Sequence, residues 1–299
     1  MGFFKYIHAV GTGTKGNRDL SFDEAKDMMT QMLDQSVPSE QIAAFLLGWR
    51  LKPETTTEFQ GALAAFDENL IKSKVNNSLE LGYPFDGKVN NPYIFPLVAK
   101  ALKKENLNLV LVGDEKQPAK DGITIKDIVS EMELNENIHY FDREKFLNKL
   151  HKLTDIRNKL GLRSSLSTIE KLTGVAQSEY AITGVFHKPY VKKYAAIYAQ
   201  RYKKLALIQG NEGTPELFSK SRLWIVDKDD IQEYIIDPAH YGIHYKKSWD
   251  KITLDESLHQ VNNPSDEYLK LAKLNAAVYL FVTERFDSIE DAYASVEAL

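Results

Sequence analysis

The sequence of 299 residues contains no cysteine. This absence excludes disulfide bonds, thiolate catalysis and cysteine-ligated metal sites. Long hydrophobic runs are also missing: the apolar stretches at residues 107–112 and 276–282 are far shorter than the roughly 20 residues that a membrane-spanning helix needs. The N-terminus has neither the basic head nor the long apolar run of a signal peptide. We therefore expect a cytoplasmic protein without membrane segments.

The residues that are present indicate a globular protein with an uneven charge. With 43% hydrophobic and 27% charged residues, the chain suits one large α/β domain and a smaller companion. The net charge is -4, yet residues 143–204 contain fourteen Lys and Arg against four acids, a net charge of +10 that leaves -14 for the remainder. Such a concentration of positive charge is what contact with a polyanion would require.

The N-terminal part of the chain shows helical periodicity. Ser21 and Glu24 form a capping-box pattern in front of apolar residues at helical spacing. Two further amphipathic patterns follow, one after Ser39 and one after Thr56 or Thr57. A polar stretch at residues 72–78 then resembles a linker. These patterns predict a small all-helical domain over residues 1–74.

After the linker, apolar runs rich in leucine and β-branched residues alternate with helical patterns. Strands are expected at residues 107–112, 138–141, 181–186, 205–209 and 223–226, and helices near residues 93–104, 123–132, 143–152 and 190–202. Two closing helices are expected after Ser265 and Ser288. The alternation predicts that residues 75–299 form a large α/β domain with a mainly parallel sheet flanked by helices.

Two small motifs carry weak signals. Residues 11–16 spell G-x-G-x-x-G, and residues 6–10 before them could be a short strand, but a dinucleotide site is disfavoured because the next helix begins only at Ser21. His240 and His244 have a spacing that could ligate a metal on a helix, but the neighbouring Pro238 and Gly242 favour a loop. His187, at the end of an expected strand, is better explained as a loop residue than as a catalytic one.

One expected helix combines tyrosines with unopposed positive charge. Tyrosines recur at every fourth position from Tyr190 to Tyr202, which indicates a stripe buried against the sheet. Residues 185–206 contain no acid, and basic side chains beside aromatics can bind phosphates and unpaired bases. The residues expected to contact phosphate are Lys188, Lys192, Lys193, Arg201, Lys203 and Lys204, with Arg157, Lys159 and Arg163 extending that surface.

The whole chain resembles a known family. RDLSFDEAKDMM at residues 18–29 is similar to the start of the helical domain of glycosyltransferase family 3, which includes anthranilate phosphoribosyltransferase and pyrimidine nucleoside phosphorylases. LGLR at 160–163, QGNEGTPE at 209–216 and LAKLNAAVYLF at 271–281 continue the resemblance, and GTGTKGNRDLS at 11–21 looks like the YbiB-like branch of the TrpD-like proteins. The resemblance implies a nucleoside phosphorylase/phosphoribosyltransferase-like fold.

The diphosphate-binding motifs of that family are altered here. The family's G-T-G-G-D loop corresponds to a stretch in which Gly82, Asp86 and Gly87 remain, followed by Lys88. Its middle residues are Tyr83, Pro84 and Phe85, which we expect to obstruct the close approach that glycines allow. The family's H-G-N-R segment is replaced by residues 112–115, VGDE, and we expect these acids, Asp114 and Glu115, to repel a diphosphate.

The remaining family positions are only partly kept. The magnesium-binding Asp-Glu pair falls on Pro215 and Glu216, so Glu216, helped by Glu212, is what remains to hold a cation. Arg163 matches the arginine that faces anthranilate, but Ser167 replaces the asparagine four residues later and EKLTGV, at residues 170–175, replaces G-P-L-x-N-P. No catalytic residue is assigned; Arg163 and Glu216 are vestigial candidates, and loss of phosphoribosyl transfer is predicted.

Three hypotheses follow for the function. The first is a protein that binds DNA or RNA without a cofactor, as a homodimer formed through the helical domain, which the resemblance to the YbiB-like branch also implies. The second is a glycosyl or phosphoribosyl transferase or a phosphorylase for a nucleobase-like or aromatic acceptor, with Mg²⁺ held by Glu216 and Glu212 and with Lys88 and Lys116 on phosphate. The third is a sensor that binds a small phosphate compound in the inherited cleft without turnover.

Overall fold

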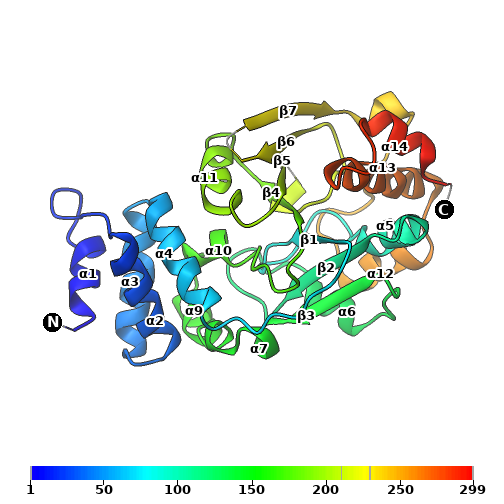
Figure 1. The fold of residues 1–299 in the computed structure, drawn as a ribbon. Helices are drawn as coiled ribbons and strands as arrows, with labels where there is room; N and C mark the ends of the chain where they lie inside the picture. Colours follow the sequence, from blue (N-terminus) through cyan, green and yellow to red (C-terminus); the bar gives the residue numbers. More distant parts are fainter. Residues whose placement is uncertain (1, 210, 229, 298–299) are drawn as a thin grey trace.

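A helical lobe and a larger α/β body make up the protein. The computed structural model describes residues 2–209, 211–228 and 230–297. Figure 1 shows the helical lobe at one end of the molecule, with the N-terminus at its tip, and the body at the other. No helix within these residues is long and apolar enough to cross a membrane.

Helices form the lobe, and capping boxes begin the second and the fourth of them. Its helices are α1 (Phe4–Gly11), α2 (Phe22–Leu33), α3 (Ser39–Leu51) and α4 (Thr56–Asp67). The expected capping box of Ser21 and Glu24 begins α2. Inside the lobe the Glu58 carboxylate accepts hydrogen bonds from the Trp49 indole, at 3.0 Å, and from the Leu20 amide, at 2.8 Å. The strand considered at residues 6–10 is wrong, because this segment lies within α1, and a dinucleotide fingerprint would need a strand there.

One seven-stranded sheet, in the order β3-β2-β1-β4-β5-β6-β7, forms the centre of the body. The strands are β1 (Ser78–Gly82), β2 (Asn108–Gly113), β3 (Ile138–Asp142), β4 (Tyr180–Val185), β5 (Lys204–Gln209), β6 (Ser221–Asp227) and β7 (Asp230–Ile236). Strands β1 to β5 are parallel, whereas β6 and β7 are antiparallel. The expected α/β architecture is confirmed, although the sequence patterns missed β1 and β7.

Helices cover both faces of the sheet. They are α5 (Phe95–Leu102), α6 (Ile125–Ser130), α7 (Arg143–Phe146), α8 (Asn148–His151), α9 (Thr154–Leu160), α10 (Leu166–Ile169), α11 (Pro189–Tyr198), α12 (Leu254–Asn262), α13 (Asp266–Val282) and α14 (Ile289–Ser295), with 3-10 turns η1 (Lys103–Glu105), η2 (Asn211–Gly213) and η3 (Pro238–Tyr241). Alternate residues of β2 enter different cores: Val110 joins the core shared with α11, and Leu111 joins the core that contains α5 and α13.

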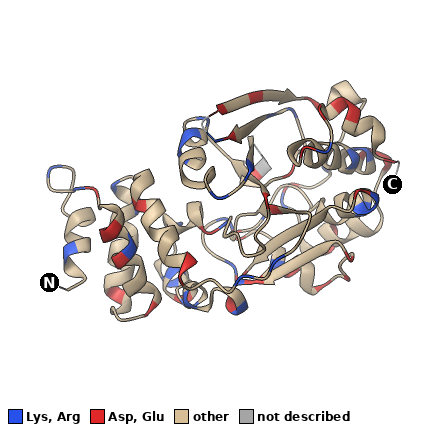
Figure 2. Ribbon diagram, viewed as in Figure 1, with Lys and Arg blue, Asp and Glu red and all other residues tan. Residues whose placement is uncertain are grey.

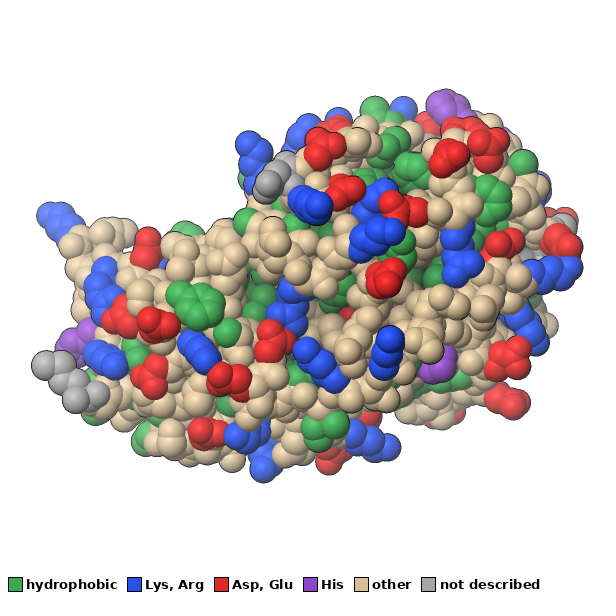
Figure 3. Space-filling model, in the orientation of Figure 1, with side chains coloured by type: hydrophobic (Ala, Val, Ile, Leu, Met, Phe, Trp, Pro, Cys, Tyr) green, Lys and Arg blue, Asp and Glu red, His purple; other side chains and the backbone are tan. Residues whose placement is uncertain are grey.

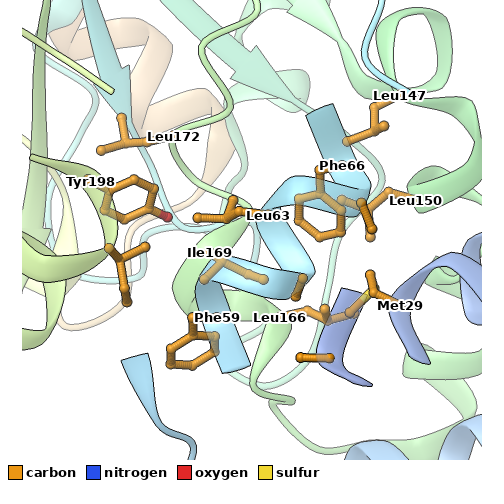
Figure 4. Packing of buried hydrophobic residues seen from close by; sticks show 14 of the residues in the cluster. Met29, Phe59, Leu63, Phe66, Leu147, Leu150, Leu166, Ile169, Leu172 and Tyr198 are labelled. Carbon is orange, nitrogen blue, oxygen red and sulfur yellow. The ribbon is translucent and has the colours of Figure 1, made fainter. Parts of the chain in front are cut away.

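The lobe and the body share one hydrophobic core. Figure 4 shows side chains of α4 packed against side chains of the body from α8, α10 and α11. The labelled contacts include Phe59, Leu63 and Phe66 of the lobe and Leu150, Leu166, Ile169 and Tyr198 of the body. Close packing of this kind fixes the position of α4 relative to the sheet. The helical lobe is therefore stabilised by residues far beyond its own segment of sequence.

Candidate functional site

A cavity of about 380 Å³ opens where the strand order reverses, at the carboxyl ends of β1 and β4 and beside the helical lobe. In parallel α/β sheets this is the position where ligands bind. The lining residues are Arg50, Pro84, Phe85, Asp86, Arg163, Ser167, Thr168, Lys171, Gly184, Val185, Phe186, His187, Tyr190, Tyr194, Glu212 and Gly213. Apolar and aromatic walls with a few charged groups suit a small, planar, polar molecule.

The loop after β1 is closed by its own side chains. Tyr83 and Phe85 are buried, and the Tyr83 hydroxyl donates a hydrogen bond of 2.8 Å to Glu216. The ring of Phe85 lies 4.4 Å from the Arg143 guanidinium carbon, while Pro84 lines the cavity. Proline and phenylalanine thus occupy positions where the resemblance implies glycine, tyrosine stands in place of threonine, and Pro84 offers no amide donor to a ligand. Obstruction of a diphosphate by this loop stays a prediction.

The carboxylates expected to hold magnesium are already engaged. Glu216 is fully buried, pairs with the Lys88 ammonium, and accepts hydrogen bonds from the Tyr83 hydroxyl and from the Ile94 amide at 2.9 Å. Glu212 accepts hydrogen bonds from two backbone amides, Val89 at 2.6 Å and Asn90 at 3.0 Å.

A divalent cation does not fit this arrangement. The Lys88 ammonium already lies against Glu216, so it supplies the positive charge that a metal would bring. Within the described ranges, the protein has no group of three or more His, Cys, Asp or Glu side chains that could hold a metal ion.

A buried charge network fills the region of the family's H-G-N-R segment. Asp114 was expected to repel a diphosphate, but it is buried, pairs with Arg143, and lies 2.6 Å from His151 Nδ1. Arg143 also contacts Glu170 at 2.5 Å, and Arg157 contacts the same carboxylate at 2.6 Å. Burial by itself would raise the pKa of Glu170, but the two guanidiniums outweigh it and lower the pKa to about 2. Asp114 is thus neutralised inside the protein and does not face the cavity.

Arg157 was expected on a nucleic-acid surface, yet the structure places it in this network. Its side chain is 1% exposed and makes two contacts with Glu170, at 2.6 and 2.8 Å. A guanidinium in the core cannot reach a polyanion at the surface. Arg163, by contrast, lines the cavity and pairs with Asp86, which Lys120 approaches to 3.4 Å.

Five of the other basic residues of the expected surface face acids from distant segments. Lys188 pairs with Glu233, Arg201 pairs with Asp67 through two contacts, and both Lys203 and Lys204 reach Glu284. Lys193 donates a hydrogen bond to the Glu54 carbonyl, and Lys159 pairs with Asp155, whereas Lys192 is exposed. Figures 2 and 3 show Lys and Arg interspersed with Asp and Glu over these elements and over the drawn face. The described residues therefore do not gather these lysines into one patch of a single sign.

Most of the tyrosine stripe is buried, as expected. Tyr194, Tyr198 and Tyr202 lie in the core, and only Tyr190 is exposed, at the edge of the cavity. His187 is exposed on the cavity wall, and His240 lies in the short turn η3.

Lys171 is a cavity residue that sequence patterns did not single out. The departure of EKLTGV from G-P-L-x-N-P was its only signal, because it places a lysine where the family has proline. Its side chain is buried, and its amine donates a hydrogen bond of 3.0 Å to the Gly184 carbonyl.

This arrangement of sheet, lobe and cleft is a phosphoribosyltransferase-type scaffold, and sequence comparison agrees. Residues 5–69 match the glycosyl transferase family's helical bundle domain, and residues 126–299 match its a/b domain. The chain belongs to this glycosyl transferase family, the same family that the sequence motifs resembled.

Individual relatives extend the match over nearly the whole chain. The chain is 28% identical to an uncharacterized protein of Aquifex aeolicus, covering 94% of this chain and 93% of that one. It is 26% identical to the anthranilate phosphoribosyltransferase of Neisseria meningitidis, over 93% of this chain and 86% of that enzyme.

Solved structures show the same fold at low identity. The anthranilate phosphoribosyltransferase of Thermus thermophilus superimposes with a TM-score of 0.76 at 16% identity, over 98% of this chain and 92% of that one. The anthranilate phosphoribosyltransferase of Saccharomyces cerevisiae in complex with PRPP and Mg gives a TM-score of 0.76 at 13% identity, over 99% of this chain and 92% of that one.

Proposed function

We propose that this protein binds a planar aromatic or nucleobase-like acceptor in the cleft of its pentosyltransferase-type scaffold. The observation that carries the proposal is the cavity at the point where the strand order reverses. Arg163 lines it beside the aromatic rings of Tyr190 and Tyr194. Aromatic walls fit a flat ring, and a guanidinium can orient a carboxylate or carbonyl on that ring.

The part of the cleft that would bind the sugar-phosphate donor is closed by side chains of the protein. The loop that would cradle a diphosphate is filled by Tyr83 and Phe85, and Glu216 is occupied by Lys88. We therefore expect no magnesium-dependent turnover of phosphoribosyl pyrophosphate. A pentose 1-phosphate, which has no diphosphate, is the donor class that this cleft would accept.

Calorimetry and a transfer assay test the proposal together. Anthranilate, uracil and adenine would be titrated into the protein, and each would then be incubated with phosphoribosyl pyrophosphate and Mg²⁺ or with ribose 1-phosphate. We expect saturable binding at one site, weakened by Arg163→Gln and unchanged by Lys192→Gln. Absence of binding by all three acceptors would contradict the proposal, and turnover with phosphoribosyl pyrophosphate would contradict the closed donor side.

Nucleic-acid binding is a second proposal, which rests on a smaller observation. Lys192 and Tyr190 are exposed on α11, and Phe186 is exposed just before this helix, so a cation and aromatic rings are exposed within one short segment of the chain. Fluorescence anisotropy of single- and double-stranded oligonucleotides over a salt series measures such binding. The proposal predicts salt-sensitive binding that is lost in Lys192→Glu with Lys188→Glu, and it fails if neither oligonucleotide binds at low salt.

Homodimerisation through the helical lobe is also a proposal. Phe4 on α1 and Leu51 on α3 are 59% and 73% exposed, and Leu47 lies one helical turn before Leu51. Exposed apolar side chains on neighbouring helices are typical of an interface. Light scattering after size exclusion should give a dimer that Leu51→Asp converts to a monomer, while Ile235→Asp on the exposed strand β7 leaves it intact. A monomeric wild type would contradict the proposal.

A further inference from the structure

Lys171 lies at the inner wall of the cavity. Lys171 is 6% exposed, and its amine donates a hydrogen bond of 3.0 Å to the Gly184 carbonyl. The same amine nitrogen lies 4.8 Å from the centre of the Tyr194 ring. Gly184 and Tyr194 also line the cavity, so the amine is held between two of its walls.

The amine lacks the counter-ion that a buried ammonium needs. Among the described residues, no ion pair to Lys171 is found. The two acids whose charge acts on Lys171 are engaged elsewhere: Asp86 pairs with Arg163, and Glu170 binds Arg143 and Arg157. Burying an ammonium without a carboxylate is costly, because the interior does not replace its hydration.

The surroundings of Lys171 lower the pKa of its amine, as expected for an amine buried without a carboxylate partner. Burial, and then the positive charge of Arg163, lower the pKa of Lys171 to about 7, against the weaker opposing effects of Asp86 and Glu170. Further charged or titratable groups on the cavity walls are Arg50, His187 and Glu212. An anion beside the amine would favour its protonated form.

Building on the proposed function, we infer that Lys171 is the receptor for an anionic group of the ligand, a carboxylate or a phosphate. The oxyanion enters the cavity, becomes the counter-ion of the ammonium, and can accept hydrogen bonds from the hydroxyls of Ser167 and Thr168, which line the same space. The aromatic rings then cover the planar part of the ligand. Arg163, already paired with Asp86, lines the same cavity and does not supply the main counter-charge.

Proton uptake on binding is the distinguishing signature. With a pKa of about 7, the free amine is mostly uncharged at higher pH and must gain a proton when the anion binds. Linkage then predicts uptake of about 0.9 proton at about pH 8 and about 0.1 proton at about pH 6. Proton uptake would be absent at both pH values if the anion met a group that is already charged, such as an arginine.

The experiment is calorimetry in buffers of different ionisation enthalpy, with anthranilate as the carboxylate probe and ribose 5-phosphate as the phosphate probe. Lys171→Met should weaken binding by about 10- to 100-fold and abolish proton uptake. Lys171→Arg keeps a permanent charge, so it should bind with little uptake if it folds, which circular dichroism checks. His187→Gln should retain the uptake, and Lys192→Met should behave as the wild type.

The outcomes separate this inference from the proposed function. Whichever probe shows the uptake identifies the anion as carboxylate or phosphate. Binding without proton uptake, or equal binding by Lys171→Met, would overturn the role of Lys171 while the acceptor cleft stands. If no probe and no nucleobase binds, the proposed function itself fails, and the inference fails with it.

Discussion

Lys88 and Glu216 form an ion pair in which both side chains are fully buried, at the carboxyl edge of the sheet. Glu216 also accepts hydrogen bonds from Tyr83 and from the Ile94 amide, and the Lys88 amine also donates to the Pro92 carbonyl at 2.6 Å. Within this cluster the positive charge is supplied by a side chain of the protein. We expect this pair to exclude a divalent cation from the Glu216 carboxylate.

Removal of one partner of this pair should be strongly destabilising. Lys88→Met leaves the buried Glu216 carboxylate without its ammonium, and we expect a loss of about 3–5 kcal/mol in the free energy of unfolding. Lys88→Met combined with Glu216→Gln should cost less than the two single changes added together, because no charge is left unpaired. Urea unfolding of the four proteins measures the coupling. Additive losses would show that the pair is not a unit.

Acid stability should depend on Glu170. The pKa of Glu170 in the folded protein is about 2, below its ordinary value of 4.5, so its stabilising effect is complete above pH 4.5 and is lost as the pH falls towards 2. This shift in pKa corresponds to about 3 kcal/mol of the free energy of unfolding. Glu170→Gln should remove that part of the acid-induced loss of stability, whereas Glu144→Gln, at an exposed position, should not. The free energy of unfolding, followed from neutral to acid pH, distinguishes the two.

Lys171 should lower the stability of the protein that carries no ligand. Because its pKa falls from 10.5 to about 7 on folding, the cost of burying the ammonium is fully present below pH 7 and disappears as the pH approaches 10.5. Lys171→Met should therefore stabilise the protein by about 1–4 kcal/mol in neutral or mildly acidic buffer. The gain should shrink in alkaline buffer, and Lys192→Met should show none. A constant gain across the pH range would contradict the assigned titration.

Gly184 is required by the close approach of β4 to η2. A Cβ atom at this position would lie 2.0 Å from the Gly213 carbonyl carbon, so one of the two backbones would have to move. Gly184→Ala should lower stability by about 1–3 kcal/mol and weaken ligand binding, because both glycines line the cavity. Gly11→Ala, whose Cβ would meet only a side-chain atom at 3.8 Å, is the control. Thermal unfolding and calorimetry measure the two effects.

Local patterns were sufficient for most helices and for five strands. Helical spacing behind Ser21 located α2, and apolar runs located the strands from β2 to β6. Strand β1 escaped because Glu80 interrupts its apolar pattern. In the folded chain this carboxylate is buried and accepts hydrogen bonds from the Thr173 amide, at 2.9 Å, and from the Tyr202 hydroxyl, at 3.0 Å. These partners lie far away in the sequence, so no local pattern could predict the burial of Glu80.

The sequence by itself determined the fold class, the family, and the loss of the glycine-rich loop, because these depend on residue identity and spacing along the chain. Only the tertiary structure decided the electrostatics. The stretch at residues 185–206 has no acid, yet folding brings Asp67, Glu233 and Glu284 against its basic side chains. The charge of a surface is a sum over segments that meet in space, and a run of one sign in the sequence therefore need not remain a patch of one sign in the protein.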